Sequence, residues 1–190
     1  MARELRRKGF HLLGLGIPII YYFIDQRTAV LLVGLLVGIA LFVELSKMLF
    51  PSFRGLFMRC FAPILRSHER KGRITGATYY LIGSFLCILF FRQDIAIVCV
   101  CFLILGDLFA AVVGKMWGRT KLLNKKSLEG SIACFVVCAL VALALMRSHP
   151  IIALAGALTA TLVELVPTGI DDNITMPLVS GLVMHLILNG

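Results

Sequence analysis

The segment "GDLFAAVVGKMWGRTKLLNKKSLEG", residues 106–130, begins as an apolar helix and ends in a burst of positive charge. Its apolar part contains one carboxylate, Asp107. On a helix, Asp107 shares one face with Ala111, Gly114 and Gly118, which follow at intervals of four, three and four residues. A face of small residues lets another backbone or a ligand approach closely. The segment therefore predicts a site at the end of a membrane helix.

The chain as a whole is too apolar for a soluble domain of its size. It has 190 residues, of which 59% are hydrophobic and 15% charged, and long apolar runs recur along it. Continuous apolar runs favour helices over the alternating strands of an outer-membrane barrel. We therefore predict an all-α, polytopic membrane helical bundle that forms a single integral membrane domain over residues 1–190. Its seven predicted transmembrane helices are residues 10–24, 28–45, 74–91, 94–114, 130–146, 150–166 and 174–189.

Positive charge is distributed unevenly between the two sides of these spans. Of the 19 Lys and Arg residues, 16 lie in the segments on one side, and the other three are Arg27, Arg92 and Arg147. The positive-inside rule then places the N-terminus in the cytoplasm and the C-terminus outside. The basic segment 46–73 also carries apolar residues at helical spacing. This pattern predicts an amphipathic helix that serves either as a surface anchor or as a wall for a lipid substrate.

Ionisable side chains in or beside the spans all fall near the predicted cytoplasmic ends. Such groups are costly to bury in a membrane and are therefore candidates for function. Their one-sided distribution favours a site at the cytoplasmic interface over a polar path through a transporter. These residues are His11, Glu44, Asp107, Glu129, Glu164, Asp171 and Asp172.

The residue types that follow Asp107 suit a polyphosphate. Basic side chains hold phosphate oxygens, helix N-termini donate backbone N–H groups, and carboxylates hold Mg²⁺ or another divalent cation. Ser127 is either part of this site or only a helix cap. The predicted phosphate-binding cations are Lys115, Arg119, Lys121, Lys125 and Lys126, and the predicted metal-binding acids are Asp107, Glu129, Asp171 and Asp172.

The N-terminal segment "ELRRKGFH", residues 4–11, presents a second group of polar residues before the first span. Arg7 and Lys8 are either topology determinants or phosphate ligands. His11 lies one turn inside the apolar stretch, where it would orient a phosphate or a lipid hydroxyl.

Together these motifs make the chain resemble the CTP-dependent lipid kinases, a family that includes dolichol (polyprenol) kinase, phytol kinase and a CTP-using diacylglycerol kinase. Residues 106–130 match the signature G-D-x-x-A-x-x-x-G-x-x-x-G-x-x-K followed by K-[ST]-x-E-G. "RRKGFH" at 6–11 resembles the family's R-K-x-x-H motif, and "ERKGRITGATYYLIG" at 69–83 resembles the opening of its third span. "GIDDNITMP" at 169–177 is similar to its C-terminal D-N-x-x-x-P segment.

The resemblance implies CTP as the phosphoryl donor and a membrane lipid alcohol as the acceptor: a polyprenol, phytol or diacylglycerol. An acid of the Asp171–Asp172 pair, or His11, would take the hydroxyl proton. The implied nucleotide site consists of Asp107, Gly114, Gly118, Lys121, Lys126, Ser127, Glu129 and Gly130.

Two other functions remain open at this point. Phosphatidate cytidylyltransferases share part of the signature and also use CTP, so cytidylyl transfer is the first alternative. A non-enzymatic membrane transporter or scaffold is the second. For the kinase, we expect a multi-pass protein of a bacterial cytoplasmic membrane, with its active site at the cytoplasmic face and no nucleic-acid partner.

Overall fold

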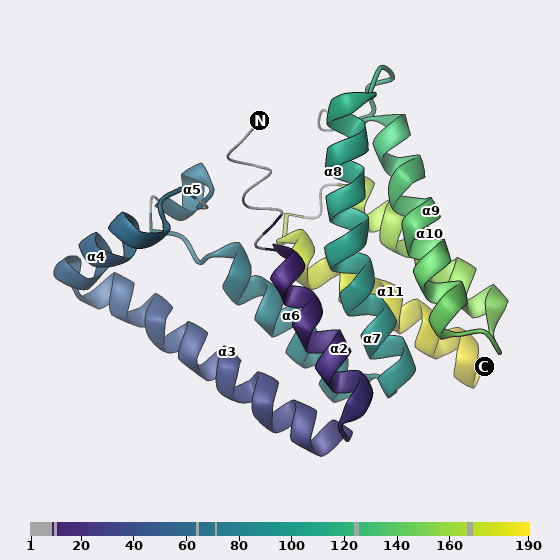
Figure 1. Cartoon of the computed structure of the whole chain (residues 1–190), viewed down its shortest axis with the longest axis horizontal. Coiled ribbons are helices and arrows are strands. Elements are labelled where there is room, and N and C mark those ends of the chain that lie inside the picture. Colours follow the sequence, from purple (N-terminus) through teal and green to yellow (C-terminus); the bar gives the residue numbers. More distant parts are fainter. Residues whose placement is uncertain (1–8, 10, 64, 71, 124–125, 167–168) are drawn as a thin grey trace.

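The computed structural model describes residues 9, 11–63, 65–70, 72–123, 126–166 and 169–190. Every named element in these ranges is a helix (Figure 1), which confirms the predicted all-α class. Each predicted apolar segment coincides with one helix or a continuous run of helices. The elements are η1 (Leu13–Leu15), α2 (Gly16–Phe23), α3 (Gln26–Leu49), α4 (Pro51–Phe61), α5 (Ser67–Arg70), α6 (Gly76–Phe90), α7 (Gln93–Cys101), η2 (Phe102–Gly106), α8 (Asp107–Met116), α9 (Leu128–Leu145), α10 (Pro150–Leu165) and α11 (Asp172–Asn189).

Within the described ranges, three helices are long and apolar enough to cross a membrane. They are α3, the continuous run from Gln93 to Met116, and α9. Three shorter apolar helices cover Leu13–Phe23, Gly76–Phe90 and Pro150–Leu165. Long apolar helices of this kind are typical of a helical membrane protein.

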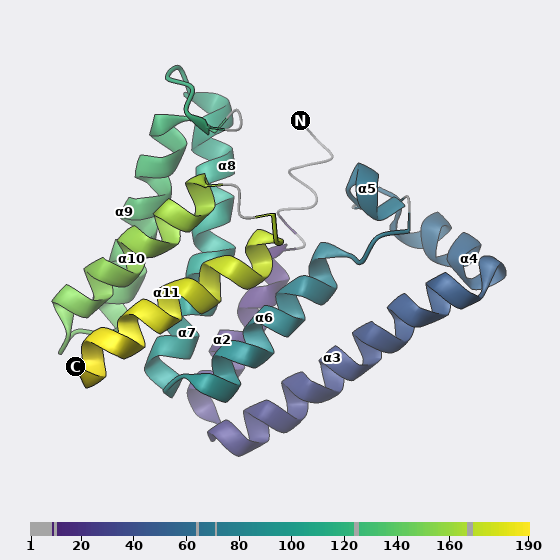
Figure 2. The same cartoon turned by 180° about the vertical axis from the view of Figure 1, so that it is seen from behind.

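The run from Gln93 to Met116 forms the centre of the bundle. Its first part, α7, is buried at every position from Ile95 to Val100 and packs against α2, α6, α9 and α11 (Figures 1 and 2). A π-helical turn, η2, follows and joins α7 to α8. Helix α8 then leaves the core and pairs with α9. Asp107 therefore lies where the central helix passes from a largely buried part to a partly exposed one.

The acid at the end of α3 has a structural role. Glu44 is buried and accepts hydrogen bonds from the backbone N–H of Thr75 (3.0 Å) and from the hydroxyls of Thr75 (2.8 Å) and Thr78 (3.0 Å). Lys47, also buried, forms an ion pair with it at 2.6 Å. Because a buried charge needs such partners, these contacts account for Glu44 as a link between α3 and the start of α6.

The predicted amphipathic segment forms two helices after α3. Pro51 begins α4, a position that suits proline because the first-turn N–H has no helical partner. No residue of α4 is buried, and the short α5 leads back toward the start of α6 (Figure 2). The segment therefore forms an arm beside the bundle.

Close contact between α6 and α11 depends on Gly83. A Cβ added at this position would lie 2.2 Å from the backbone carbonyl oxygen of Asn173. By contrast, a Cβ added at Gly38 of α3 would meet no atom within 4 Å. The two glycines therefore offer a matched pair for testing the packing.

We expect Gly83→Ala to destabilise the protein by about 1–3 kcal/mol, because the added methyl group overlaps a backbone atom that cannot move alone. Gly38→Ala adds the same methyl group in open space and should be neutral or stabilising by up to about 1 kcal/mol. Thermal unfolding of both variants in detergent measures the difference. A wild-type melting temperature for Gly83→Ala would contradict this account of the α6–α11 contact.

Candidate functional site

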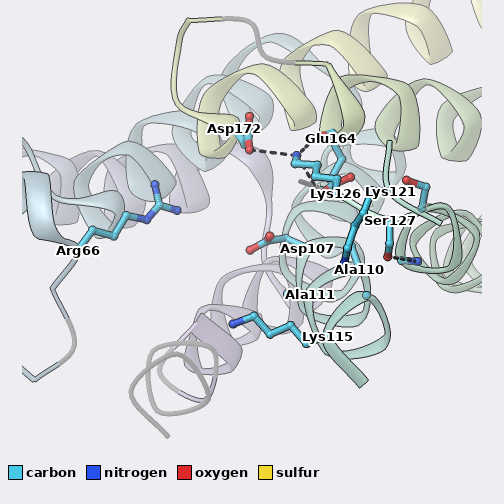
Figure 3. Close-up of a pocket in the computed structure, with 13 residues that line it drawn as sticks. Arg66, Asp107, Ala110, Ala111, Lys115, Lys121, Lys126, Ser127, Glu164 and Asp172 are labelled. Carbon is cyan, nitrogen blue, oxygen red and sulfur yellow. Dashed lines mark hydrogen bonds and ion pairs between the residues drawn. The ribbon is translucent and has the colours of Figure 1, made fainter. Parts of the chain in front are cut away.

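A pocket of about 600 Å³ lies where α8, α9, α10 and the start of α11 meet (Figure 3). Four helices, the loop before α5 and the loop between α8 and α9 contribute to its wall, although their residues are far apart in sequence. The small or polar lining residues are Ala110, Ala111, Gly114, Ser127, Gly130 and Ser131, and the charged ones are Arg66, Asp107, Lys115, Lys121, Lys126, Glu164 and Asp172.

Asp107 opens α8 directly after the π-helical turn and is partly buried. Ala111 and Gly114, which sequence spacing places on the same face, line the pocket with it, whereas Gly118 lies outside the lining. Between Asp107 and Lys115, the two charged side chains of α8 in the lining, the wall consists of small residues (Figure 3). Local sequence spacing therefore predicted most of this wall.

The glycines of the signature pack α8 against α9. A Cβ at Gly118 would lie 2.1 Å from the carbonyl oxygen of Gly114 and 2.6 Å from Ser127 Oγ. A Cβ at Gly130 would lie 2.7 Å from the carbonyl oxygen of Ala110. These positions admit only glycine without a shift of backbone, so the structure shows them as packing positions.

Ser127 combines the two roles that its sequence position left open. It is the N-cap of α9, and its hydroxyl accepts a hydrogen bond from the backbone N–H of Gly130 at 3.2 Å. Its side chain also lines the pocket. Ser131, one turn further into α9, lines the same wall, and its hydroxyl is buried without a hydrogen-bond partner among the described residues.

Glu129 holds the loop that joins α8 to α9. Its Oε1 accepts hydrogen bonds from the backbone N–H groups of Arg119 (3.0 Å) and Thr120 (3.1 Å). Neither Glu129 nor Arg119 lines the pocket. An isolated β-bridge between Lys121 and Ser127 closes the loop, and Lys121 Nζ donates to the carbonyl oxygen of Gly118 at 3.2 Å. Lys125, the remaining predicted cation of this loop, lies outside the described residues.

Lys126 joins three elements at the pocket. Its Nζ lies 2.9 Å from Glu164 Oε1 and 3.9 Å from Asp172 Oδ2, and it also donates to the backbone carbonyl of Glu164. The start of α9 is thereby tied to the end of α10 and the start of α11. In this arrangement Glu164 neutralises much of the charge of Lys126.

Asp172 lies just before the predicted span at 174–189 and is close to several charged side chains. Partial burial raises its pKa above the usual range, because desolvation disfavours the charged carboxylate. Lys126 opposes this shift, whereas three nearby carboxylates add to it: Asp107, Asp171 and Glu164. An excess of carboxylates in one place favours binding of a cation.

The donor set fits Mg²⁺ if a phosphate ligand completes it. In the part of the chain that the structure describes, no three His, Cys, Asp or Glu residues are arranged to hold a metal ion by themselves. Asp107 and Asp172 nevertheless line one pocket together with several basic side chains. Mg²⁺ is commonly held by one or two carboxylates plus substrate phosphates and water. Two carboxylates therefore suffice for a site that forms with the nucleotide.

Four other predicted residues, Asp171, His11, Arg7 and Lys8, lie outside the pocket lining or the described chain. Asp171 is the N-cap of α11, and its Oδ1 accepts from the backbone N–H of Asn173 at 3.0 Å. His11 packs edge-on against Tyr80, with ring centroids 5.6 Å apart. Arg7 and Lys8 fall outside the described residues, so their predicted phosphate contacts stay predictions.

Comparison with known proteins decides the family. The CTP-dependent diacylglycerol kinase 1 of Schizosaccharomyces pombe is 30% identical over 156 residues, which cover 73% of this chain and 71% of that protein. The chain belongs to the CTP-dependent lipid kinase family. The "Probable phytol kinase, chloroplastic" of Triticum aestivum is 34% identical over 149 residues, covering 67% of this chain and 49% of that kinase. An uncharacterized protein of Rickettsia prowazekii is 28% identical over 184 residues, covering 92% of this chain and 90% of its own length.

Two further comparisons found nothing similar. No family model matches the chain, and no solved structure does so either.

In this lipid kinase, the pocket includes residues that the predicted site omitted. The sequence position of Glu164 could have identified it as a site residue, because it is an acid within an apolar span. The position of Ser131 gave little indication of a site, because a serine inside an apolar helix is common in membrane proteins. Nothing in the sequence singled out Arg66, because it is one of seven basic residues between 46 and 73. Only the path of the chain before α5 brings it to the pocket.

Proposed function

We propose that this chain transfers the γ-phosphoryl group of CTP to the hydroxyl of a membrane lipid alcohol, releasing CDP. Membership of the CTP-dependent lipid kinase family supports the donor and the reaction class. The observation that carries the proposal further is that Asp107 and Asp172 meet in one pocket with Arg66, Lys115 and Lys121. Cations for phosphate oxygens and carboxylates for a metal are the two parts that such a reaction requires.

The acceptors named for its relatives give the substrate class. These relatives are a diacylglycerol kinase and a phytol kinase, and both acceptors are apolar molecules with one free hydroxyl. We propose that this chain acts on an alcohol of the same kind, with diacylglycerol, phytol and polyprenol as the candidates. The pocket lies beside the ends of apolar helices, where a hydroxyl at headgroup depth would reach it.

In the proposed step, the acceptor oxygen forms a bond to the γ-phosphorus, and the bond from that phosphorus to the β–γ bridging oxygen breaks. Asp107 and Asp172 would hold Mg²⁺, which when bound neutralises charge on the phosphate oxygens. Lys115 and Lys121 hold the phosphates in line with the acceptor. Of the three candidates for the hydroxyl proton, only Asp172 lines the pocket. We assign proton acceptance to one oxygen of its carboxylate, while the other oxygen would hold the metal.

We further propose that seven helices cross the membrane and that the pocket faces the cytoplasm, with the N-terminus inside and the C-terminus outside. The uneven distribution of Lys and Arg supports this orientation. Cysteines introduced at positions 121 and 92 in a cysteine-free background should react with impermeant reagents from opposite sides. Labelling of position 121 from outside only would invert the orientation.

The test of the reaction uses purified protein in detergent with Mg²⁺ and CTP labelled at either the α- or the γ-phosphate. Diacylglycerol, phytol and polyprenol are supplied separately. We expect label from γ in one phosphorylated lipid and none from α. Transfer of the α label into lipid, tested with phosphatidate as acceptor, would identify a cytidylyltransferase instead. Absence of label from both positions with every acceptor would contradict the proposed function.

A further inference from the structure

We propose that Arg66 binds a phosphate group at the edge of the pocket, and that Glu69 positions Arg66 for this contact. The inference rests on the proposed function and adds a binding residue and a positioning residue to it. The signature segment contains neither. Arg66 lies just before α5, in the arm that connects α3 to α6.

Arg66 approaches the pocket from the side opposite the signature loop. Figure 3 shows its guanidinium across from Lys121 and Ser127, with Asp107 and Asp172 between them. Its side chain is 32% exposed, so a ligand can reach it. Lys115 and Lys121 come from α8 and the loop that follows, and Glu164 neutralises Lys126. A polyphosphate held by that loop would therefore need a donor on the far side.

The one ion pair of Arg66 in the described structure orients the guanidinium without saturating it. Arg66 NH1 lies 3.0 Å from Asp171 Oδ2, and the carboxylate of Asp171 is itself only 13% exposed. A guanidinium carries five N–H donors in a planar fork. One contact to Asp171 fixes the plane of this fork and leaves donors for two oxygens of a phosphate.

Glu69 holds the backbone that carries Arg66. It is 4% exposed, and each carboxylate oxygen accepts one backbone hydrogen bond: Oε2 from Arg66 N at 2.6 Å and Oε1 from Gly76 N at 2.8 Å. Gly76 is the first residue of α6. Glu69 therefore ties Arg66 directly to the start of a bundle helix, although α5 itself is only one turn long.

A closed ring of contacts completes this support. A Cβ at Gly76 would lie 3.2 Å from Glu69 Oε1 and 3.5 Å from Asn173 Nδ2, so both side chains pack over this glycine. Asn173 donates its backbone N–H to Asp171 at 3.0 Å, and Asp171 pairs with Arg66. The ring fixes Arg66 relative to α6 and α11. The second of these helices begins with Asp172.

The first test compares the kinetic constants of Arg66→Gln with those of the wild type. We expect KM for CTP to rise about 10- to 100-fold, the range for a lost charged hydrogen bond, with a smaller change in kcat. The KM of Arg66→Lys for CTP should fall between those of the wild type and Arg66→Gln, because the lysine ammonium keeps the charge but lacks the planar fork of donors. The control is Arg59→Gln, which removes the same charge from an exposed position on α4 and should keep the wild-type KM.

A phosphate of CTP and the phosphate of the lipid product present the same chemistry to Arg66. Inhibition by the phosphorylated lipid separates them. A raised KM for CTP assigns Arg66 to the nucleotide, and a raised inhibition constant for the lipid phosphate alone assigns it to the product. Wild-type values of both would overturn the proposal. If the wild type itself transferred no label from CTP, the proposed function would fail instead.

The second test separates positioning by Glu69 from a general structural role. Glu69→Gln keeps the shape but has one acceptor oxygen, so it can satisfy only one of the two N–H groups. We expect it to raise KM for CTP in the wild-type background and to add little in the Arg66→Gln background, because both changes act through one contact. If the fold increases in KM from Glu69→Gln and Arg66→Gln multiply in the double variant, the positioning role would be overturned. A Glu69→Gln defect in kcat alone would also overturn it.

Discussion

Asp107→Asn is expected to abolish turnover while the protein still inserts and folds. The amide has the shape of the carboxylate, and Asp107 lies in a pocket wall of small residues that tolerate it. What the change removes is the charge that would hold Mg²⁺ beside the phosphates. Loss of such a ligand should slow transfer about 1000-fold, or about 4 kcal/mol of transition-state stabilisation.

The control for this prediction lies on the same continuous helix. Asp94 lies in the first turn of α7, at the opposite end of the run, and forms an ion pair with Arg92 at 3.2 Å. Asp94→Asn makes the identical chemical change outside the pocket and should leave turnover within a factor of about three, since surface ion pairs contribute little. Rates of label transfer and melting temperatures of both variants are measured together. More than a tenth of wild-type turnover in Asp107→Asn would remove Asp107 from the metal site.

The second large effect concerns Asp107 and Asp172 as a unit. Asp107→Ala and Asp172→Ala should each remove most activity, and the double variant should be little worse than either. Residues that act in one catalytic arrangement are strongly non-additive, whereas independent residues multiply their losses. Raising Mg²⁺ should partly restore the single variants and have no effect on the double variant.

Asp172 also lies 3.9 Å from Lys126, so Asp172→Ala could act through the lysine. Lys126→Gln supplies the comparison, because it removes the same pairing and keeps both carboxylates. If Lys126→Gln reproduces the loss seen in Asp172→Ala, and the Asp107 and Asp172 losses multiply, the two aspartates do not share a metal.

Sequence reasoning succeeded where a site depends on local spacing. Asp107, Ala111 and Gly114 share a face because of helical periodicity alone, and the structure places all three in the pocket wall. The helical character of the seven predicted apolar segments followed from their run length, because each coincides with one helix or a run of helices among the described residues. Their number as membrane spans stays a prediction. The ends of these helices shifted by only a few residues, because caps such as Ser127 and Asp171 decide where each helix starts.

Sequence reasoning was weaker where the role of a residue depends on tertiary contacts. The signature alone does not tell whether Gly118 and Gly130 pack against a neighbouring helix, and the close contacts with Ser127 and α8 show that they do. The predicted nucleotide contacts of these two glycines stay predictions. The sequence predicts Glu129 as a metal ligand, and only the folded loop reveals that its Oε1 accepts two backbone N–H groups. Its metal contact stays a prediction. Arg66 reaches the pocket through a turn that no periodicity predicts.

The π-helical turn at Phe102–Gly106 sets the direction in which Asp107 points. A π turn holds one residue more than an α-helical turn between the same hydrogen-bonded ends, and each residue of an α-helix turns the chain by about 100°. In an unbroken α-helix from Gln93, every side chain of α8 would therefore be rotated about the helix axis by roughly 100° relative to its position here. One additional residue, placed in a largely buried turn, thus determines which way the acid faces. A deletion there would leave the composition almost unchanged and misdirect the carboxylate.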